Sequence, residues 1–410
     1  MTPHSLAATA LAVSALLLPL VGIFAPLGLA PLGAVAALAC LPLVIRERSW
    51  GNLPAAVLWL PLLLAVWAAV SALWAIDPRE ALAGAAKQAL STIGGLILVA
   101  AALDLDQKDR RRLAWYLMAG SLAGAALLTA EYLTDRGISS LIAKAKHRPL
   151  VGIKSPLNRG ATILILCTAT CMAQFRHSKP RWPLVVSAIA LLAMFSSDSL
   201  STRLAALTGL AAGAIVMAWP RRGIHLVIAA VAALWIVAPI GAANMPSPHY
   251  TFQHWTWLPL SSHHRTTIWG FTGSHIAEKP IIGWGMEASR QLPGADDEVQ
   301  LWRTFDNGQP RLGITESMLP LHPHNGILQI WLELGVFGAL LAGAFLVRVL
   351  AGIDRLDSAD RTGRAIACGI YCAALTIGTT SYGIWQSWWQ AGLWFIAAFT
   401  LSGLKQRDIP

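Results

Sequence analysis

Charged side chains are scarce in this sequence. Asp, Glu, Lys and Arg make up 13% of the 410 residues, and hydrophobic residues make up 55%. A soluble globular domain carries roughly 25% charged residues. The deficit runs along the whole chain, which excludes a soluble domain with one anchor and indicates a polytopic membrane protein.

Cysteines are also few, and no loop carries a pair of them. All five lie within apolar runs, so neither a disulfide framework nor a cysteine metal site is indicated. The first apolar run has no Lys or Arg before it, whereas a cleaved signal peptide has a basic start. We therefore expect this run to be retained as the first membrane span. The cysteines are Cys40, Cys167, Cys171, Cys368 and Cys372.

Long apolar runs recur through the chain, and roughly 20 apolar residues in a helix cross a bilayer. We expect an all-α polytopic membrane protein with about twelve transmembrane helices. The long segment 244–323 separates the ninth run from the tenth, which divides the chain into 1–243, 244–323 and 324–410. The runs are 6–25, 27–45, 53–75, 82–103, 112–133, 158–175, 182–196, 203–219, 224–243, 324–347, 364–383 and 385–404.

Basic residues in the short loops set the orientation. With the N-terminus in the cytoplasm, more than half of the 31 lysines and arginines fall in cytoplasmic segments, as the positive-inside rule requires. The exceptions gather in 144–160 and in the long segment. We take the net charge of +10 to reflect contacts with anionic membrane lipids and a bound polyanion rather than nucleic acid. The alternative is that the outer basic residues only touch lipid headgroups.

Three arginines are candidates for binding an anion at the outer face. Arg203 lies in "SSDSLSTRLAAL", where the alternative is a structural pair with Asp198. Arg265 opens "RTTIWGFTGSHIAEKPIIGWG", a stretch that suggests an interfacial helix; otherwise it is a surface charge. Arg159 follows Lys154 in "KSPLNRG" and could instead snorkel to the interface.

Residues 319–338 read "LPLHPHNGILQIWLELGVFG". Asn325 is expected to cap the helix that follows. His324 would then lie at the mouth of this helix, on a face shared with Gly335 and Gly338, which would admit a close helix neighbour. The positive helix end favours a neutral ring that can accept a proton. The alternative is a histidine that only hydrogen-bonds a neighbouring loop.

Three motifs together resemble the O-antigen ligase and polymerase superfamily. "HNGILQIWLELGVFG" resembles its His-Asn signature, and "RLAAL" resembles its Arg-x-x-x-Leu element. "RTTIW…EKPIIGWG" resembles its arginine-led loop helix ending in Pro-x-x-Gly-x-Gly. The order of the three motifs and the long loop between the ninth and tenth spans also match.

The resemblance implies a metal-independent membrane glycosyltransferase of the GT-C type in the bacterial inner membrane, with its active site facing the periplasm. Its donor would be a glycan on undecaprenyl pyrophosphate, and its acceptor a sugar of lipid A–core. His324 would be the base, with Arg203 and Arg265 on the pyrophosphate. We expect Arg159, Lys154, His322 and Asn325 to complete the substrate site.

Other motifs are weaker indications of function. "DLD" (104–106) matches a metal-binding Asp-x-Asp but falls on the cytoplasmic side, and "ADDEVQ" (295–300) fits solvated surface. The first outer loop has no carboxylate, which disfavours metal-dependent GT-C enzymes, and we expect no cofactor. The tryptophans of 384–394 are expected to form an interfacial belt.

Three competing functions remain open. An O-antigen polymerase or a protein O-oligosaccharyltransferase would share the chemistry and differ in the acceptor. A lipid-linked glycan transporter would need charges at mid-membrane depth, whereas those found here lie near the outer ends of the runs.

Overall fold

The computed structural model describes residues 2–145, 155–304, 310–356 and 359–404. Helices predominate in these ranges, and eight of them are long and apolar enough to cross a membrane. The chain is therefore a multi-pass membrane protein. The eight are α1 (Pro3–Phe24), α2 (Leu29–Glu47, preceded by η1, Pro26–Gly28), α3 (Ala55–Val70, continued by η3, Ser71–Leu73), α4 (Pro78–Asp104), α5 (Gln107–Leu133), α9 (Leu200–Ala218), α10 (Pro220–Ala243) and α13 (Gly326–Asp354).

Four more of the expected apolar runs are helical as well. One of them, α8, has 15 residues, fewer than a perpendicular span needs. The expected total of about twelve spans therefore stays a prediction. These helices are α7 (Ser155–Phe175), α8 (Arg181–Phe195), α14 (Arg361–Thr380) and α15 (Ser387–Leu404); the short α6 (Gly137–Ala145) and η2 (Ser49–Asn52) lie between spans.

Short polar residues set where several helices begin. The Asp77 carboxylate accepts hydrogen bonds from two backbone N–H groups at the start of α4. Asp106 accepts one such bond at the start of α5, and Ser199 accepts one at the start of α9. Each side chain satisfies donors that have no partner within the helix, so polar residues between apolar runs mark the helix ends.

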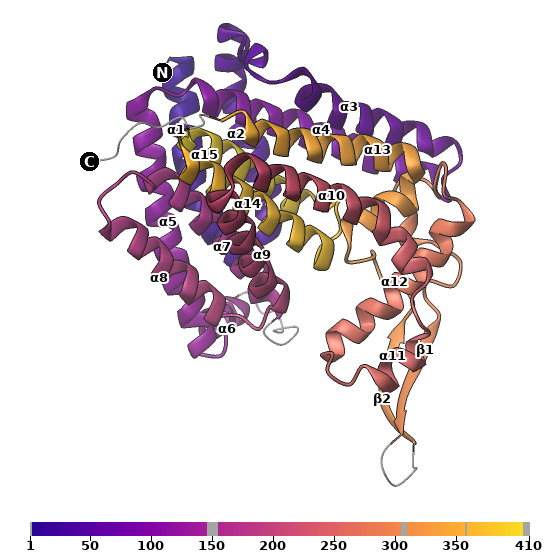
Figure 1. Cartoon of the computed structure of the whole chain (residues 1–410). Helices are drawn as coiled ribbons and strands as arrows, with labels where there is room; N and C mark the ends of the chain where they lie inside the picture. The colour runs from indigo at the N-terminus through magenta and orange to yellow at the C-terminus, as the bar shows by residue number, and fades with distance from the viewer. Residues whose placement is uncertain (1, 146–154, 305–309, 357–358, 405–410) are drawn as a thin grey trace.

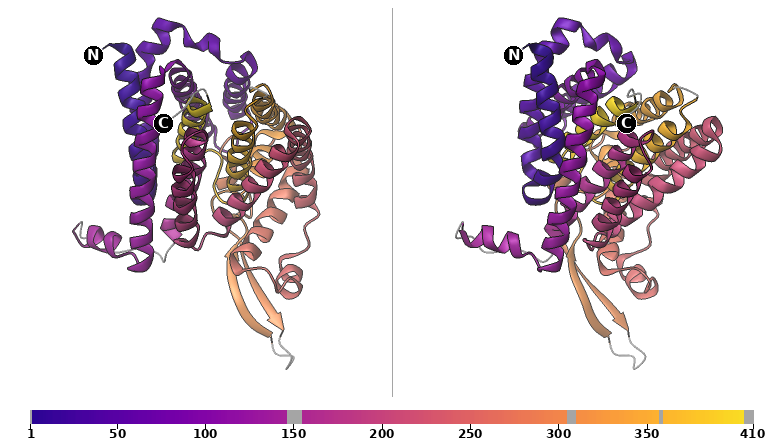
Figure 2. Two further views of the ribbon diagram at one scale, coloured as in Figure 1. Left: turned by 60° about the vertical axis from the view of Figure 1, so that its left-hand side comes forward. Right: turned by 90° about the vertical axis from the view of Figure 1, so that its left-hand side faces the viewer.

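The helices pack into one bundle, and a long β-hairpin leaves it at the end opposite the N-terminus (Figures 1 and 2). The largest apolar core joins α1, α2, α4, α5, α7, α8 and α15 with parts of α9 and α14. Helix α9 packs closely on α14. A Cβ at Gly209 would lie 2.8 Å from the Gly369 carbonyl oxygen, and the reverse distance is the same. Glycine at both positions is what permits this approach.

Helix α13 is broken at Gly335, which has φ 61° and ψ −161°. The turn segment 280–285 fills the break: Val336 N–H donates to Pro280 O (2.9 Å), and Gly285 N–H donates to Glu333 O (2.8 Å). A Cβ on Gly335 would lie 2.2 Å from Ile281 O. The expectation that this glycine admits a neighbouring helix was wrong, because its close neighbour is the backbone of a turn.

The segment between α10 and α13 is partly helical, as expected, but it also contains strands. The strands pair antiparallel, with Leu301 opposite Ile314 and a register shift between Leu301 and Trp302. The expected all-α class therefore needs a correction. Alternation of apolar and polar residues in "EVQLWRT" favours a strand. The elements are α11 (Pro248–His254), α12 (Leu260–Glu278), η4 (Ala288–Arg290), β1 (Glu298–Thr304) and β2 (Pro310–Ser317).

Candidate functional site

The N-terminus of α13 carries the histidines that the sequence singled out. Asn325 caps the helix as expected, accepting from the N–H groups of Ile327 (3.0 Å) and Leu328 (3.2 Å). His324 precedes the cap and has φ 53°, so it lies outside the helix. Its predicted place on a helical face with Gly335 was therefore wrong. The turn before the cap, and not helical periodicity, sets the direction of the ring.

The two histidine rings lie side by side, with centroids 4.3 Å apart. The His324 N–H donates to His322 Nδ1 (3.2 Å), and His322 Nε2 lies 3.0 Å from Gln386 Nε2. His324 Nδ1 lies 2.5 Å from Ser381 O. A carbonyl oxygen only accepts, so His324 Nδ1 carries the proton and the neutral ring has its lone pair on Nε2.

Both rings are held in their neutral form. Burial lowers the pKa of His322 to about 3, with smaller contributions from His324, Arg290 and Arg159. Burial also lowers the pKa of His324, and the nearby Arg265 and His264 lower it further. The hydrogen bond to Ser381 raises this pKa and so partly opposes them. Near pH 7 the pair therefore consists of two neutral imidazoles.

Two of the predicted arginines reach this pair. The Arg159 guanidinium, from the first turn of α7, lies 5.5 Å from the centroid of the Trp388 ring. Arg265, on α12, donates from Nη1 to Ser261 O (3.2 Å), and its buried Nε has no partner within the described chain. Burial lowers the pKa of Arg265. Arg265 is therefore a cation with an unused donor.

Arg203 and Lys154 are the other two basic residues that the sequence predicted for this site. Arg203 is exposed and donates from Nη2 to Ser197 O (2.8 Å), and not to Asp198. Its neighbour Thr202 lies 3.1 Å from Thr162, which in turn lies 3.3 Å from the Tyr382 hydroxyl near the histidines. Lys154 lies outside the described residues. We call His322, His324, Arg159, Arg265, Arg290 and Gln386 the histidine site.

Sequence reasoning missed Arg290, Gln386 and Glu333, whose carboxylate bonds to the turn just before Arg290. Glu333 is fully buried in α13. A signal for it existed, because a lone carboxylate inside an apolar membrane run is a functional candidate by default. Arg290 and Gln386 had no comparable signal, since their place at the site depends on tertiary contacts.

The tryptophans of 384–394 do not form the predicted interfacial belt. Trp388 is 3% exposed and Trp389 is fully buried. The Trp388 indole N–H donates to Gln386 Oε1 (2.8 Å), and that of Trp385 donates to Glu333 Oε2 (2.7 Å). The indoles of Trp385 and Trp388 fix polar groups of the site, which the sequence pattern alone did not distinguish from membrane anchoring.

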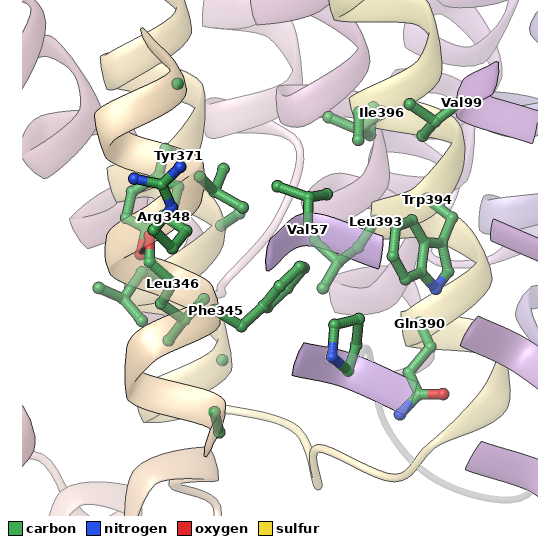
Figure 3. Close-up of a pocket in the computed structure, with 18 of the residues that line it drawn as sticks. Val57, Val99, Phe345, Leu346, Arg348, Tyr371, Gln390, Leu393, Trp394 and Ile396 are labelled. Atoms are coloured by element: carbon green, nitrogen blue, oxygen red, sulfur yellow. Dashed lines mark hydrogen bonds between the residues drawn. The ribbon is translucent and has the colours of Figure 1, made fainter. Parts of the chain in front are cut away.

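A small polar pocket and a large apolar cavity share the lining residue Trp385 at this site. The pocket, of about 40 Å³, is lined by His322, Arg290, Gln386 and Trp385 among others. Trp385 also lines the cavity, of about 620 Å³, which reaches Arg348 near the other end of α13 (Figure 3). Its labelled walls are mostly apolar, including Val57, Phe345, Leu393 and Trp394.

The described residues contain one cluster with metal-ligand geometry, made by His4, Asp106 and Asp109. It lies at the N-termini of α1 and α5, away from the histidine site. Asp106 already caps α5, and Asp104 accepts from Asn52 (2.9 Å), so "DLD" has structural uses. The 295–300 segment is exposed at Asp296–Glu298, which confirms its reading as solvated surface.

The fold and this site define a multi-pass membrane protein with a cationic, histidine-bearing pocket at one end of its bundle. A family model described as O-antigen ligase matches residues 185–343, which include Arg203, Arg265 and His324. The chain belongs to the O-antigen ligase family, and it is a ligase-type membrane enzyme.

Two relatives extend the match over most of the chain. A Rickettsia bellii protein named "Putative polysaccharide ligase" is 30% identical over 354 residues, covering 85% of this chain and 80% of its own length. A Rickettsia conorii protein, "Putative polysaccharide ligase RC0486", is 28% identical over 364 residues, covering 86% and 82%.

Proposed function

We propose that this protein is an O-antigen ligase of the GT-C type. It transfers a glycan from undecaprenyl pyrophosphate to a sugar of lipid A–core at the periplasmic face of the bacterial inner membrane. One observation carries the proposal: His324 donates its Nδ1 proton to Ser381 O and so keeps Nε2 as a proton acceptor, next to Arg265 and Arg159.

The chemistry follows from this arrangement. The acceptor hydroxyl oxygen attacks the anomeric carbon of the donor glycan, and its proton passes to His324 Nε2. The bond from that carbon to the pyrophosphate oxygen breaks, and the electron pair leaves with the pyrophosphate. Arg265, Arg159 and Arg203 neutralise the negative charge that develops there. Attack opposite the leaving group inverts the anomeric centre, and no metal is needed.

The apolar cavity supports a lipid-linked donor. A polyprenyl chain has no hydrogen-bonding groups, so it is best solvated by an apolar wall such as the one in Figure 3. Because Trp385 lines both the cavity and the polar pocket, a tail in the cavity would leave its pyrophosphate near His322 and Arg290.

The charge distribution supports the orientation. Arg46 lies in the last turn of α2 and Lys108 in the first turn of α5, at the end away from the histidine site. These residues would be cytoplasmic, and the segment between α10 and α13 would then be periplasmic. Residues 1–243 and 324–410 would then form one membrane domain around this loop.

The polymerase and the protein O-oligosaccharyltransferase use the same donor chemistry, so acceptor choice is the test. Purified protein is mixed with undecaprenyl-pyrophosphate-linked glycan and one of three acceptors: lipid A–core, a second lipid-linked glycan, or a Ser/Thr peptide. Extension of lipid A–core supports the ligase. Extension of either other acceptor in its place refutes it, and a transporter would extend none.

A further inference from the structure

Glu333 is a buried carboxylate that receives four hydrogen bonds. Oε2 accepts from Glu287 N–H (2.7 Å) and from the Trp385 indole N–H (2.7 Å). Oε1 accepts from Ser289 Oγ (2.5 Å) and Gln329 Nε2 (3.0 Å). Two of the four donors belong to residues 287–289, so the carboxylate ties this turn to α13.

The turn is held in an unusual shape. Glu287 has φ 62°, a left-handed conformation that costs a residue with a side chain about 1 kcal/mol or more. Such a conformation persists where its surroundings enforce it, and the bond from Glu287 N–H to Glu333 does so here. The turn continues directly into Arg290, which ends η4.

Arg290 lies near His322. Glu287 Oε2 lies 3.3 Å from Arg290 Nε, and the arginine side chain is 56% exposed. It lines the small pocket together with His322 and Gln386. A guanidinium has five N–H donors, so donors remain after the pairing with Glu287.

We propose that Arg290 is a further phosphate-binding residue of this site, and that Glu333 is the positioning residue that directs it there through the 287–289 turn. The proposal rests on the proposed function. Arg290 then approaches the pyrophosphate from the loop side, while Arg159 approaches from α7 and Arg265 from α12. With Arg203 from α9, four guanidinium groups would then neutralise the anion, and a guanidinium binds phosphate through two parallel hydrogen bonds.

The test of Arg290 uses Arg290→Gln and Arg290→Lys. The control is Arg46→Gln, since Arg46 also pairs with a glutamate through Nε (3.4 Å) and is 67% exposed, but lies at the other end of the bundle. We expect Arg290→Gln to weaken binding of undecaprenyl pyrophosphate roughly 10-fold or more, Arg290→Lys to recover part of that loss, and Arg46→Gln to change nothing.

Binding is measured directly, by the tryptophan fluorescence of purified protein, so this arm does not need transfer to occur. Unchanged affinity in Arg290→Gln overturns the proposal, even if the wild type transfers glycan. Weakened affinity in a protein that transfers nothing supports the anion site and counts against the proposed function alone.

Glu333 is tested through its coupling to Arg290. Glu333→Gln keeps the volume but replaces one acceptor oxygen with a donor, and Ser289→Ala serves as a milder change should that variant fail to fold. If Glu333 acts through Arg290, either variant raises KM for the donor more than it lowers kcat. The double variant with Arg290→Gln should bind donor no more weakly than Arg290→Gln alone. Additive losses would mean that Glu333 only stabilises the fold, and would overturn its positioning role.

Discussion

His324 Nδ1 lies 2.5 Å from the carbonyl oxygen of Ser381, a residue 57 positions further along the chain. The bond joins the turn before α13 to the end of α14, and it fixes which ring nitrogen carries the proton. The backbone of His324 is itself left-handed at φ 53°, so the ring is oriented from both sides. A ring fixed in this way presents Nε2 as an acceptor before any substrate arrives, which lowers the reorganisation needed in the reaction.

Replacing His324 with alanine should abolish transfer while donor binding persists, because the base is lost and the arginines remain. A positioned base contributes roughly 10²–10⁴-fold, so we expect kcat to fall by about that factor. His322→Ala is the matched comparison and should lose less, since both of its ring nitrogens already face protein groups. Donor affinity and single-turnover rates are measured on both variants. Normal turnover by His324→Ala would show that His324 is not the base, and so would a failure caused only by lost donor binding.

The pH profile should follow His324. Burial, Arg265 and His264 lower its pKa below the ordinary 6.5, so the unprotonated ring persists to lower pH than a free imidazole would allow. We expect kcat/KM to be flat above about pH 6.5 and to fall only below it, as the ring gains a proton. Donor affinity is measured over the same range as a control for phosphate ionisation. An acidic limb centred above pH 6.5 would show that another group is the base.

Arg265→Ala and Arg203→Ala should each nearly abolish transfer in protein that still inserts. Arg265 has a buried Nε without a partner in the described chain, and a pyrophosphate oxygen would satisfy it. Lysine should restore little at either position, because it lacks the planar fork. Initial rates at matched expression test both residues, and near wild-type transfer by the two alanine variants would refute a phosphate role.

Gly335→Ala should destabilise the protein by several kcal/mol. The backbone there has φ 61°, and a Cβ would lie 2.2 Å from Ile281 O. Gly352→Ala is the control in the same helix, since nothing lies within 4 Å of its added Cβ. Thermal unfolding in detergent should show a clear loss for the first variant and little change for the second. Equal stability of the two would mean that the break in α13 is not required.

Transfer should survive EDTA. The proposed mechanism neutralises the pyrophosphate with arginines, and the described cluster of His4, Asp106 and Asp109 lies at the other end of the bundle. Asp109→Asn should leave the transfer rate unchanged, both with and without EDTA. A reaction that EDTA stops and Mg²⁺ or Mn²⁺ restores would overturn the metal-independent mechanism.

The sequence determined the features that depend on local composition. Apolar runs predicted the membrane helices because a helix satisfies all of its backbone hydrogen bonds within one segment, as the bilayer interior requires. Asn325 was predictable as a cap, since capping depends on the two or three residues after it. The motifs that led to His324, Arg203 and Arg265 are also local strings of sequence, and a family match over residues 185–343 spans all three.

Tertiary structure decided what these residues contact. Periodicity assigned His324 to a helix face, but His324 precedes the cap of α13 and the Ser381 carbonyl, just after α14, sets the orientation of its ring. The pattern "IWQSWWQ" fits either interface or core, and only the packing of α15 against α2, α4 and α7 buries Trp388 and Trp389. Arg290 and Glu333 are 43 positions apart in the sequence. The turn that leads into Arg290 reaches Glu333 because Gly335 breaks α13 and lets residues 280–285 bond to its backbone. This arrangement depends on contacts between distant residues, so composition and spacing give little sign of it.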